Sequence, residues 1–145
     1  MKFKIYENTL PSDAVKIREN VFVKEQGFEN EFDETDKTAA HIVLYDEEAG
    51  DELPVAACRV FESGDDENTY ILGRLAVIRS HRGKNIGADM IREAQRYVLS
   101  KGGKIIALHA QCRVSGFYKK LGFCEYGGIE DDEGCPHIWM RKIIE

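Results

Sequence analysis

The stretch from Thr69 to Ala110 constrains the fold most, because its hydrophobic pattern changes twice. "TYILGRLAV" is apolar over strand length, the residues from Lys84 repeat apolar positions at helical spacing, and "KIIALHA" is apolar again. Gly102 and Gly103 are expected to end the helix. A helix between two neighbouring strands cannot form a hairpin, so these strands must be parallel and joined by a right-handed crossover.

The residues before this unit predict an antiparallel arrangement. "KFKIY" predicts a short strand, and Pro11 and Ser12 open a helix that has Ser12 as its N-cap and ends near Gly27. "HIVLYD" and "PVAACRVFE" predict two strands joined by a turn over 47–53, and with "TYILGRLAV" they form a three-strand meander. Apolar residues at helical spacing predict the buried stripe of the first helix: Ala14, Ile17, Val21 and Phe22.

The C-terminal residues predict a short helix and a hairpin. "RVSGFYKKL" is typical of a helix that ends at Gly122. "FCEYGGI" and "PHIWMRKII" predict two strands around the acidic turn "EDDEG". No linker composition interrupts the 145 residues, so we expect a single α/β domain over 1–145.

Composition excludes several classes of protein. The apolar fraction of 43% and charged fraction of 32% are typical of a soluble globular chain. A net charge of -6 argues against nucleic acid or an anionic membrane as the main partner. We expect a cytoplasmic protein, because the sequence shows no secretory signal or apolar membrane span, and its four cysteines form no CxxC pair. The histidines show no metal-ligand spacing, and His81 lies in a loop.

That loop, from Arg79 to Ala88, has the features of an anion site. It follows a strand and opens a helix, whose first N–H groups and dipole favour an anion. Gly83 and Gly87 allow close approach to the backbone, and Arg79, Arg82 and Lys84 are expected to add mobile positive charge. The Walker and GxGxxG patterns are absent, which disfavours ATP and NAD. A plain loop between strand and helix remains the alternative.

Two motifs carry a resemblance to a known family. "RGKNIGA" resembles the R/Q-x-x-G-x-G/A signature of GNAT N-acetyltransferases, and "SGFYKKLGF" resembles their F-Y-x-x-x-G-F element. "RENVFVKEQGF" and "GCPHIWM" are similar to the ElaA-like branch. The resemblance implies a mixed antiparallel and parallel sheet of about seven strands flanked by about four helices, splayed between strands 4 and 5 after Val77.

The resemblance also implies acetyl-CoA as cofactor. Loop amides would hold the coenzyme A diphosphate, strand backbone would pair with the pantetheine arm, and the Val77 N–H would face the thioester oxygen. Asn85 replaces the family's first loop glycine, and asparagine tolerates positive φ. The cofactor-binding residues that follow are Leu75, Ala76, Val77, Arg82, Gly83, Lys84, Asn85, Ile86, Gly87, Ala88, Gln111 and Tyr118.

Tyr118 matches the family's proton donor for the departing thiolate, and packing in the core with Phe117 is the alternative. The glutamate that some relatives place before the loop is absent. His109, His137 or Glu25 could take the proton of the amine, as could a chain of waters.

Arg59 and Arg74 interrupt apolar strands, and a buried arginine needs a partner. Ion pairs with Glu25, Asp33 or Asp36 would satisfy them. Alternatively, Arg59, Arg74 and Glu25 bind the acceptor, with an arginine fork on its carboxylate. The acidic segment 29–36 favours a cationic amine instead, so the two indications conflict.

The sequence therefore predicts an acetyl-CoA-dependent N-acetyltransferase that acts on a primary amine of a small molecule or peptide by direct attack. A non-catalytic acyl-CoA-binding sensor or interaction module is the alternative, and a phosphate-binding protein unrelated to coenzyme A is a third. The apolar strand "HIWMRKII" could pair across a homodimer.

Overall fold

The structure, a computed structural model, describes residues 1–48 and 52–144. The sheet has seven strands, as the resemblance implied, and their order is β1-β2-β3-β4-β5-β7-β6. The chain divides into two compact units, of residues 1–61 with 74–94 and of residues 62–73 with 95–144. Strand β4 (Thr69–Val77) and helix α2 (Ile86–Ser100) contribute residues to both units.

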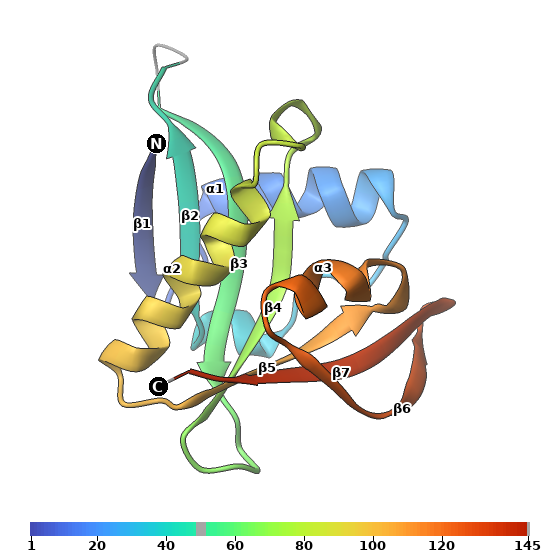
Figure 1. The fold of residues 1–145 in the computed structure, drawn as a ribbon. Coiled ribbons are helices and arrows are strands. Elements are labelled where there is room, and N and C mark those ends of the chain that lie inside the picture. The colour runs from blue at the N-terminus through green and yellow to red at the C-terminus, as the bar shows by residue number, and fades with distance from the viewer. Residues whose placement is uncertain (49–51, 145) are drawn as a thin grey trace. The chain divides into compact units, whose positions relative to one another are not determined.

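The first unit contains an antiparallel sheet and a helix with an irregular second half. Its further elements are β1 (Lys2–Glu7), α1 (Ser12–Arg18), the π-helix η1 (Glu19–Glu25), the 3-10 helix η2 (Glu34–Lys37), β2 (Ala40–Asp46), β3 (Leu53–Glu62) and the 3-10 turn η3 (Arg79–His81). Strand β2 pairs antiparallel with β1 on one side and β3 on the other. Figure 1 shows these three strands side by side. The turn expected over 47–53 includes residues 49–51, which lie outside the described part of the chain.

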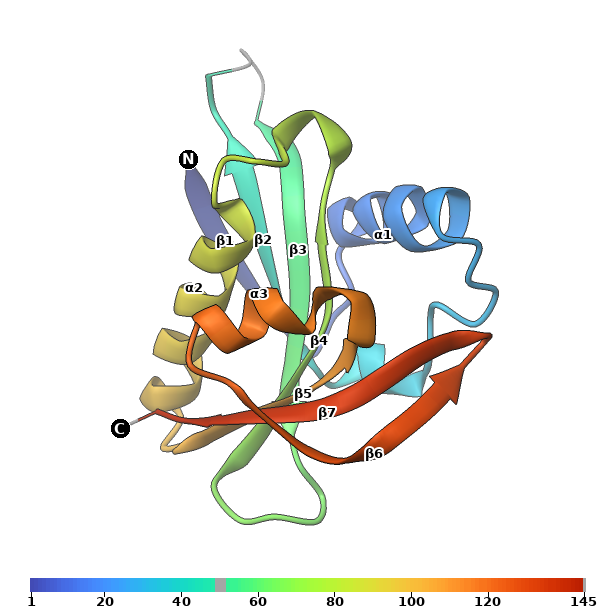
Figure 2. The ribbon, with the colours of Figure 1, turned by 45° about the vertical axis from the view of Figure 1, so that its right-hand side comes forward.

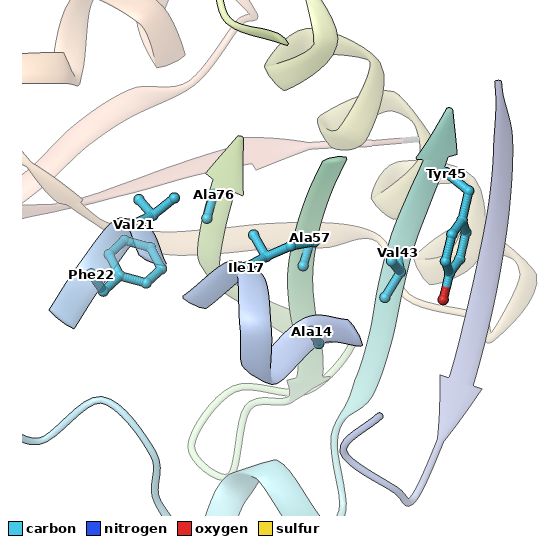
Figure 3. Close-up of a cluster of buried hydrophobic side chains, with 8 residues drawn as sticks. All are labelled: Ala14, Ile17, Val21, Phe22, Val43, Tyr45, Ala57 and Ala76. Carbon is cyan, nitrogen blue, oxygen red and sulfur yellow. The ribbon is translucent and has the colours of Figure 1, made fainter. Parts of the chain in front are cut away.

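The predicted stripe of the first helix packs on this sheet. Ala14, Ile17, Val21 and Phe22 are buried against residues of β2, β3 and β4. Figure 3 shows these side chains directed at Val43, Ala57 and Ala76 on the strands. Each buried aliphatic side chain contributes about 1.5–3 kcal/mol by leaving water, so the stripe fixes the helix on the sheet.

The boundaries of the first helix differ from the prediction. Pro11, not Ser12, is the N-cap: its carbonyl accepts hydrogen bonds from the N–H groups of Ala14 and Val15, at 3.1 and 3.2 Å. The fixed φ of proline suits an extended residue immediately before a helix. After Arg18 the helix continues as the π-helical η1, which the sequence did not indicate. Gly27 follows with φ +79°, which confirms it as the terminating residue.

The second unit contains the parallel pair and the C-terminal hairpin. Its further elements are β5 (Ile105–Gln111), the 3-10 turn η4 (Cys112–Val114), α3 (Ser115–Lys120), β6 (Cys124–Asp132) and β7 (Cys135–Ile143). Strand β7 is antiparallel to both β5 and β6, and Figure 2 shows the three together. The hairpin turn is shorter than predicted, because Glu130–Asp132 pair with β7 and leave the bend to Glu133 and Gly134, both at positive φ.

The parallel pairing predicted for β4 and β5 is confirmed. The ladder joins Thr69–Ile71 to Ile105–Ala107 and then stops, although β4 continues to Val77 and β5 to Gln111. The pairing of β4 with β5 therefore ends before Val77, the residue after which the two strands were expected to separate. The α-helices of the described residues are α1, α2 and α3, with the π-helical and 3-10 segments beside them, where about four helices were expected.

Candidate functional site

The loop between β4 and α2 turns on two residues of positive φ. Gly83 has φ +81° and Asn85 has φ +62°, which confirms that asparagine takes the place of the family's glycine in this conformation. The Asn85 carbonyl accepts the first helical hydrogen bond, from Asp89 N–H at 3.1 Å. The N–H groups of the first turn of α2 therefore lack intrahelical partners, and Gly83, Lys84 and Asn85 are exposed beside them. Amides arranged in this way at the start of a helix are suited to an anion.

The side chain of Arg82 is held by protein groups. Its Nε donates to the Val77 carbonyl at 2.9 Å, and Nη1 and Nη2 donate to the two carboxylate oxygens of Glu25, both at 3.0 Å. Arg79 also reaches Glu25, at 3.5 Å. Lys84 is the basic side chain of this loop for which the described structure shows no ion pair. The backbone amides and Lys84 are thus the loop groups best placed for an anion.

Glu25 is a poor candidate for the base. The hydrogen bond from Arg82 is the main cause that lowers the pKa of the Glu25 carboxyl below its usual range. A general base works best with a pKa near the working pH, and this shift moves Glu25 away from it. The structure places Glu25 beside Arg82 rather than beside Arg59 or Arg74, so it is not their ion-pair partner.

The backbone of β4 changes direction at Arg74, which has φ +53° within a strand. The next residues, Leu75–Val77, lead into the loop. Ile78 donates its N–H to the Val55 carbonyl of β3 at 2.9 Å. Successive N–H groups of an extended strand point to opposite edges, so the Val77 N–H points away from β3.

Arg59 and Arg74 join a buried network of ion pairs. Arg59 forks onto Asp33, with Nη1–Oδ1 at 2.6 Å and Nη2–Oδ2 at 3.1 Å, and its Nη1 also reaches Asp36 at 2.9 Å. Arg74 Nε lies 3.2 Å from Glu31 Oε2, and its Nη2 lies 3.4 Å from Asp33. The ion pairs predicted with Asp33 and Asp36 are confirmed for Arg59, whose side chain is 6% exposed.

Arg18 completes this network from α1 and was not predicted. Its Nε donates to Glu31 at 2.8 Å, and its Nη1 donates to Asp36 at 2.7 Å. Burial raises the pKa of Glu31, whereas at Asp36 burial is outweighed by hydrogen bonds from Arg18 and others, which lower its pKa to about 2. Three guanidinium groups thus balance three carboxylates. Glu31, Asp33 and Asp36 are therefore neutralised by arginines and add no net negative charge to the segment 29–36. The prediction that this segment favours a cationic acceptor amine loses its main support.

In the second unit, the two candidate histidines lie together. The rings of His109 and His137 are 5.0 Å apart, and His109 stacks on Trp139 at 4.8 Å. Burial, and then the neighbouring His137, lowers the pKa of His109. His137 Nδ1 lies 2.8 Å from the Cys135 carbonyl, which can only accept, so Nδ1 carries the proton and Nε2 is the basic nitrogen of the neutral ring.

Tyr118 and Gln111 belong to the same unit. Tyr118 lies on α3, half-buried, with its ring edge-on to Phe117 at 5.0 Å and Phe123 at 5.9 Å. Phe117 is 37% exposed, so the alternative of a shared core position with Phe117 is wrong. Gln111 ends β5, and its Oε1 accepts from Arg113 Nε at 2.7 Å. The roles of Tyr118 and Gln111 toward a cofactor stay predictions.

Comparison with known proteins decides the family. A family model described as the acetyltransferase (GNAT) family matches residues 7–123. YjcF of Bacillus subtilis, named an uncharacterized N-acetyltransferase, is 36% identical over 133 residues, which cover 90% of each chain. The chain belongs to the GNAT acetyltransferase family. The enzyme class that the two motifs predicted, an acetyltransferase, is thereby confirmed.

Two other GNAT proteins bear on branch and fold. ElaA of Escherichia coli is 31% identical over 97 residues, 66% of this chain and 63% of ElaA. Its crystal structure superposes with a TM-score of 0.84 at 24% identity, covering 97% of this chain and 98% of that one. An aminoglycoside 6'-N-acetyltransferase, crystallised with coenzyme A, has a TM-score of 0.73 at 17% identity and covers 100% and 98%. The predicted GNAT fold and likeness to ElaA are confirmed.

In this GNAT chain, sequence reasoning missed His81 and Asp46. His81 lies in the loop itself, with its ring buried and its Nε2 2.8 Å from Asp46 Oδ2. The position of His81 inside the basic loop could have drawn attention to it, but Asp46, its partner, is 35 positions away in sequence.

None of the helices in the described part of the chain has the length and apolar character that crossing a membrane requires.

Proposed function

We propose that the protein is an acetyl-CoA-dependent N-acetyltransferase that transfers the acetyl group to a primary amine of a small molecule or peptide by direct attack. The observation that carries this proposal is the loop with Gly83 and Asn85 at positive φ, immediately before the fifteen-residue helix α2. The coenzyme A present in the crystal of the related aminoglycoside acetyltransferase supports the choice of cofactor. A cytoplasmic location and a possible homodimer belong to the same proposal.

The backbone would supply most of the cofactor contacts. The amides from Gly83 to Ala88, with the Lys84 ammonium, suit the diphosphate of coenzyme A. The backbone of Leu75–Val77 would pair with the pantetheine arm, which leaves the Val77 N–H to stabilise negative charge on the thioester oxygen. Acetyl-CoA, when bound, supplies an activated acetyl group. The protein's task is then to orient this group and to move two protons.

Tyr118 is proposed as the acid. A phenol has a pKa near 10 and is protonated at neutral pH, so it holds a proton for the departing thiolate, whose thiol has a pKa near 8.5. The transfer is uphill by about 1.5 pKa units, or roughly 2 kcal/mol, and solvent then returns a proton to the phenolate. His109 and His137 are proposed as the candidates for the base. The lowered pKa of His109 keeps its ring neutral at neutral pH, as a base that accepts a proton from the acceptor ammonium must be.

The decisive experiment is a thiol-release assay with acetyl-CoA. The panel holds polyamines, amino acids, amino sugars and peptides with free N-termini. We expect at least one amine to give turnover, and we expect Tyr118→Phe to lose about 100-fold or more in kcat while it still binds coenzyme A. Phe117→Leu, a change at the exposed neighbour of Tyr118, serves as the control that alters packing but not the acid.

Normal turnover in Tyr118→Phe would show that the assigned acid is wrong. Binding of coenzyme A with only slow hydrolysis across the panel would instead support the non-catalytic acyl-CoA sensor. With an active amine in hand, His109→Gln and His137→Gln separate the two base candidates. The variant that lacks the base loses the rise of kcat/KM with pH that the wild type shows as that base deprotonates.

A further inference from the structure

The loop between β4 and α2 contains one buried ring among exposed neighbours. The residues of 82–85 are exposed, and so is Ser80, whereas His81 is 8% exposed. The imidazole therefore points into the protein at the centre of the segment that would face the diphosphate. A histidine in this setting needs hydrogen-bond partners for both ring nitrogens.

Both nitrogens have partners. Nε2 lies 2.8 Å from Asp46 Oδ2, and because a carboxylate can only accept, Nε2 carries a proton and donates it. Nδ1 lies 2.8 Å from the hydroxyl oxygen of Ser80. The hydrogen bond from His81 is the main cause that lowers the pKa of Asp46, so that side chain remains ionised at neutral pH.

Asp46 is fixed in turn by the sheet. It is the last residue of β2, and its second carboxylate oxygen accepts the Glu48 N–H at 2.9 Å. At the other end, the His81 N–H closes the 3-10 turn η3 on the Ile78 carbonyl at 3.0 Å. The ring thus ties the start of the loop to the end of β2. Gly83, the first residue at positive φ, lies only two positions later.

We propose that His81 and Asp46 are positioning residues of the cofactor loop. Neither side chain would touch the diphosphate. Their partly buried hydrogen bond holds η3 against β2, so that the amides after it are already aligned when the diphosphate arrives. A binding site that is ordered before binding loses less conformational entropy on binding, and its affinity is higher. This inference rests on the proposed function, because it concerns the same loop.

The experiment compares two ligands that differ in the diphosphate. Coenzyme A carries it, whereas pantetheine does not. We expect Asp46→Asn to raise the Kd of coenzyme A by about tenfold, since the charged partner in a partly buried hydrogen bond is lost. The Kd of pantetheine should stay within about twofold, and kcat at saturating acetyl-CoA should change little, because the reacting groups are untouched.

Two further variants test the hydrogen bond itself. His81→Gln can still place a donor near the position of Nε2, whereas His81→Asn is too short to reach Asp46. We expect the affinity for coenzyme A to fall in the order wild type, His81→Gln, His81→Asn. The double variant His81→Asn with Asp46→Asn should bind no more weakly than His81→Asn alone, since both changes remove one interaction.

His41 provides a matched control. It is another buried histidine of the same unit, 1% exposed, with Nε2 2.9 Å from the Asp36 carbonyl. His41→Asn should lower the midpoint of urea unfolding without changing the ratio of the two dissociation constants. An equal change of that ratio in His41→Asn would overturn the inference, because the effect would then be general destabilisation.

Failure of the inference can be told from failure of the proposed function. Wild-type protein that binds coenzyme A while Asp46→Asn and His81→Asn bind it equally well overturns the positioning role alone. Wild-type protein that does not bind coenzyme A overturns both. The test does not require that His81→Asn folds, because Asp46→Asn changes a side chain at the end of β2 and keeps its size.

Discussion

At the scale of single residues, Asn85 shows how one conformation can depend on one side chain. Its φ of +62° lies in the left-handed region, which asparagine and glycine adopt at low cost and β-branched residues do not. The amides on either side of it belong to the proposed diphosphate site. The conformation of this residue should therefore determine the affinity for coenzyme A.

We expect Asn85→Gly to leave the Kd of coenzyme A within about twofold of the wild type. Asn85→Val should raise it about tenfold or more, because strain of roughly 1–3 kcal/mol must be relieved by moving the loop. Calorimetric titration measures both. Asn68, with φ +60° in a turn before β4, is the control: Asn68→Val should reduce stability and leave the Kd unchanged. Wild-type affinity in Asn85→Val would argue against the loop as the site.

A positive φ can be predicted from the sequence only where the residue type itself favours that conformation. The positive φ of Asn85 could be predicted because asparagine stands in a glycine position of a recognisable loop. The φ of +53° at Arg74 could not, since "TYILGRLAV" has the pattern of a regular strand. The pairing of His81 with Asp46 was also hidden, because only the folded sheet brings these two residues together.

At the scale of elements, ion pairs of Asp36 connect η2 to α1 and to β3. Asp36 accepts hydrogen bonds from Arg18 and Arg59, and from the sequence its own segment, residues 29–36, was described only as acidic. The sequence predicted Asp33 and Asp36 among the partners of Arg59 because a buried arginine needs a counter-charge and the segment 29–36 is rich in carboxylates. It did not predict Arg18, because an arginine near the end of an amphipathic helix is usually exposed to solvent.

Asp36→Asn should lower the free energy of unfolding by about 3–5 kcal/mol, because it leaves buried guanidinium groups without their counter-charge. The pH dependence should change as well. The pKa of Asp36 falls from 3.8 to about 2 on folding, so its ionisation adds about 2 kcal/mol above pH 3.8 that is lost as the pH falls toward 2. Glu31 acts in the opposite sense, because its raised pKa makes protonation favour the folded state.

Urea unfolding at a series of pH values measures this prediction. The wild type should lose stability across the acid window, and Asp36→Asn should start lower and show a smaller slope there. Glu34→Gln is the control, because Glu34 is 89% exposed and pairs only with Lys37 within the described structure, a kind of contact worth little. Equal slopes in wild type and Asp36→Asn would contradict the assignment of the lowered pKa.

At the scale of the whole molecule, the order of elements was predictable and the division of the chain was not. The alternation of strand and helix patterns gave the strand and helix order, and two motifs gave the family. Contacts within the chain nevertheless group residues 74–94 with the N-terminal part and residues 62–73 with the C-terminal part. Two of the three boundaries fall inside β4 and α2, and the third falls before the last residue of β3. The sequence shows no linker at any of them, so no composition signal could mark them.

A strand and a helix that supply residues to both units should make unfolding cooperative, and we therefore propose one domain over residues 1–145. Calorimetry should show a single transition whose enthalpy equals the van't Hoff value. Coenzyme A at about 100 times its Kd adds roughly 2.7 kcal/mol to the free energy of unfolding. For a chain of this size that corresponds to a rise of about 5–10 °C in Tm, and the whole transition should move. Asn85→Val, with a Kd about tenfold higher or more, should show about half of that shift or less at the same concentration. Two transitions, of which coenzyme A moves only one, would mean that the units unfold independently and that the ligand stabilises the loop's unit alone.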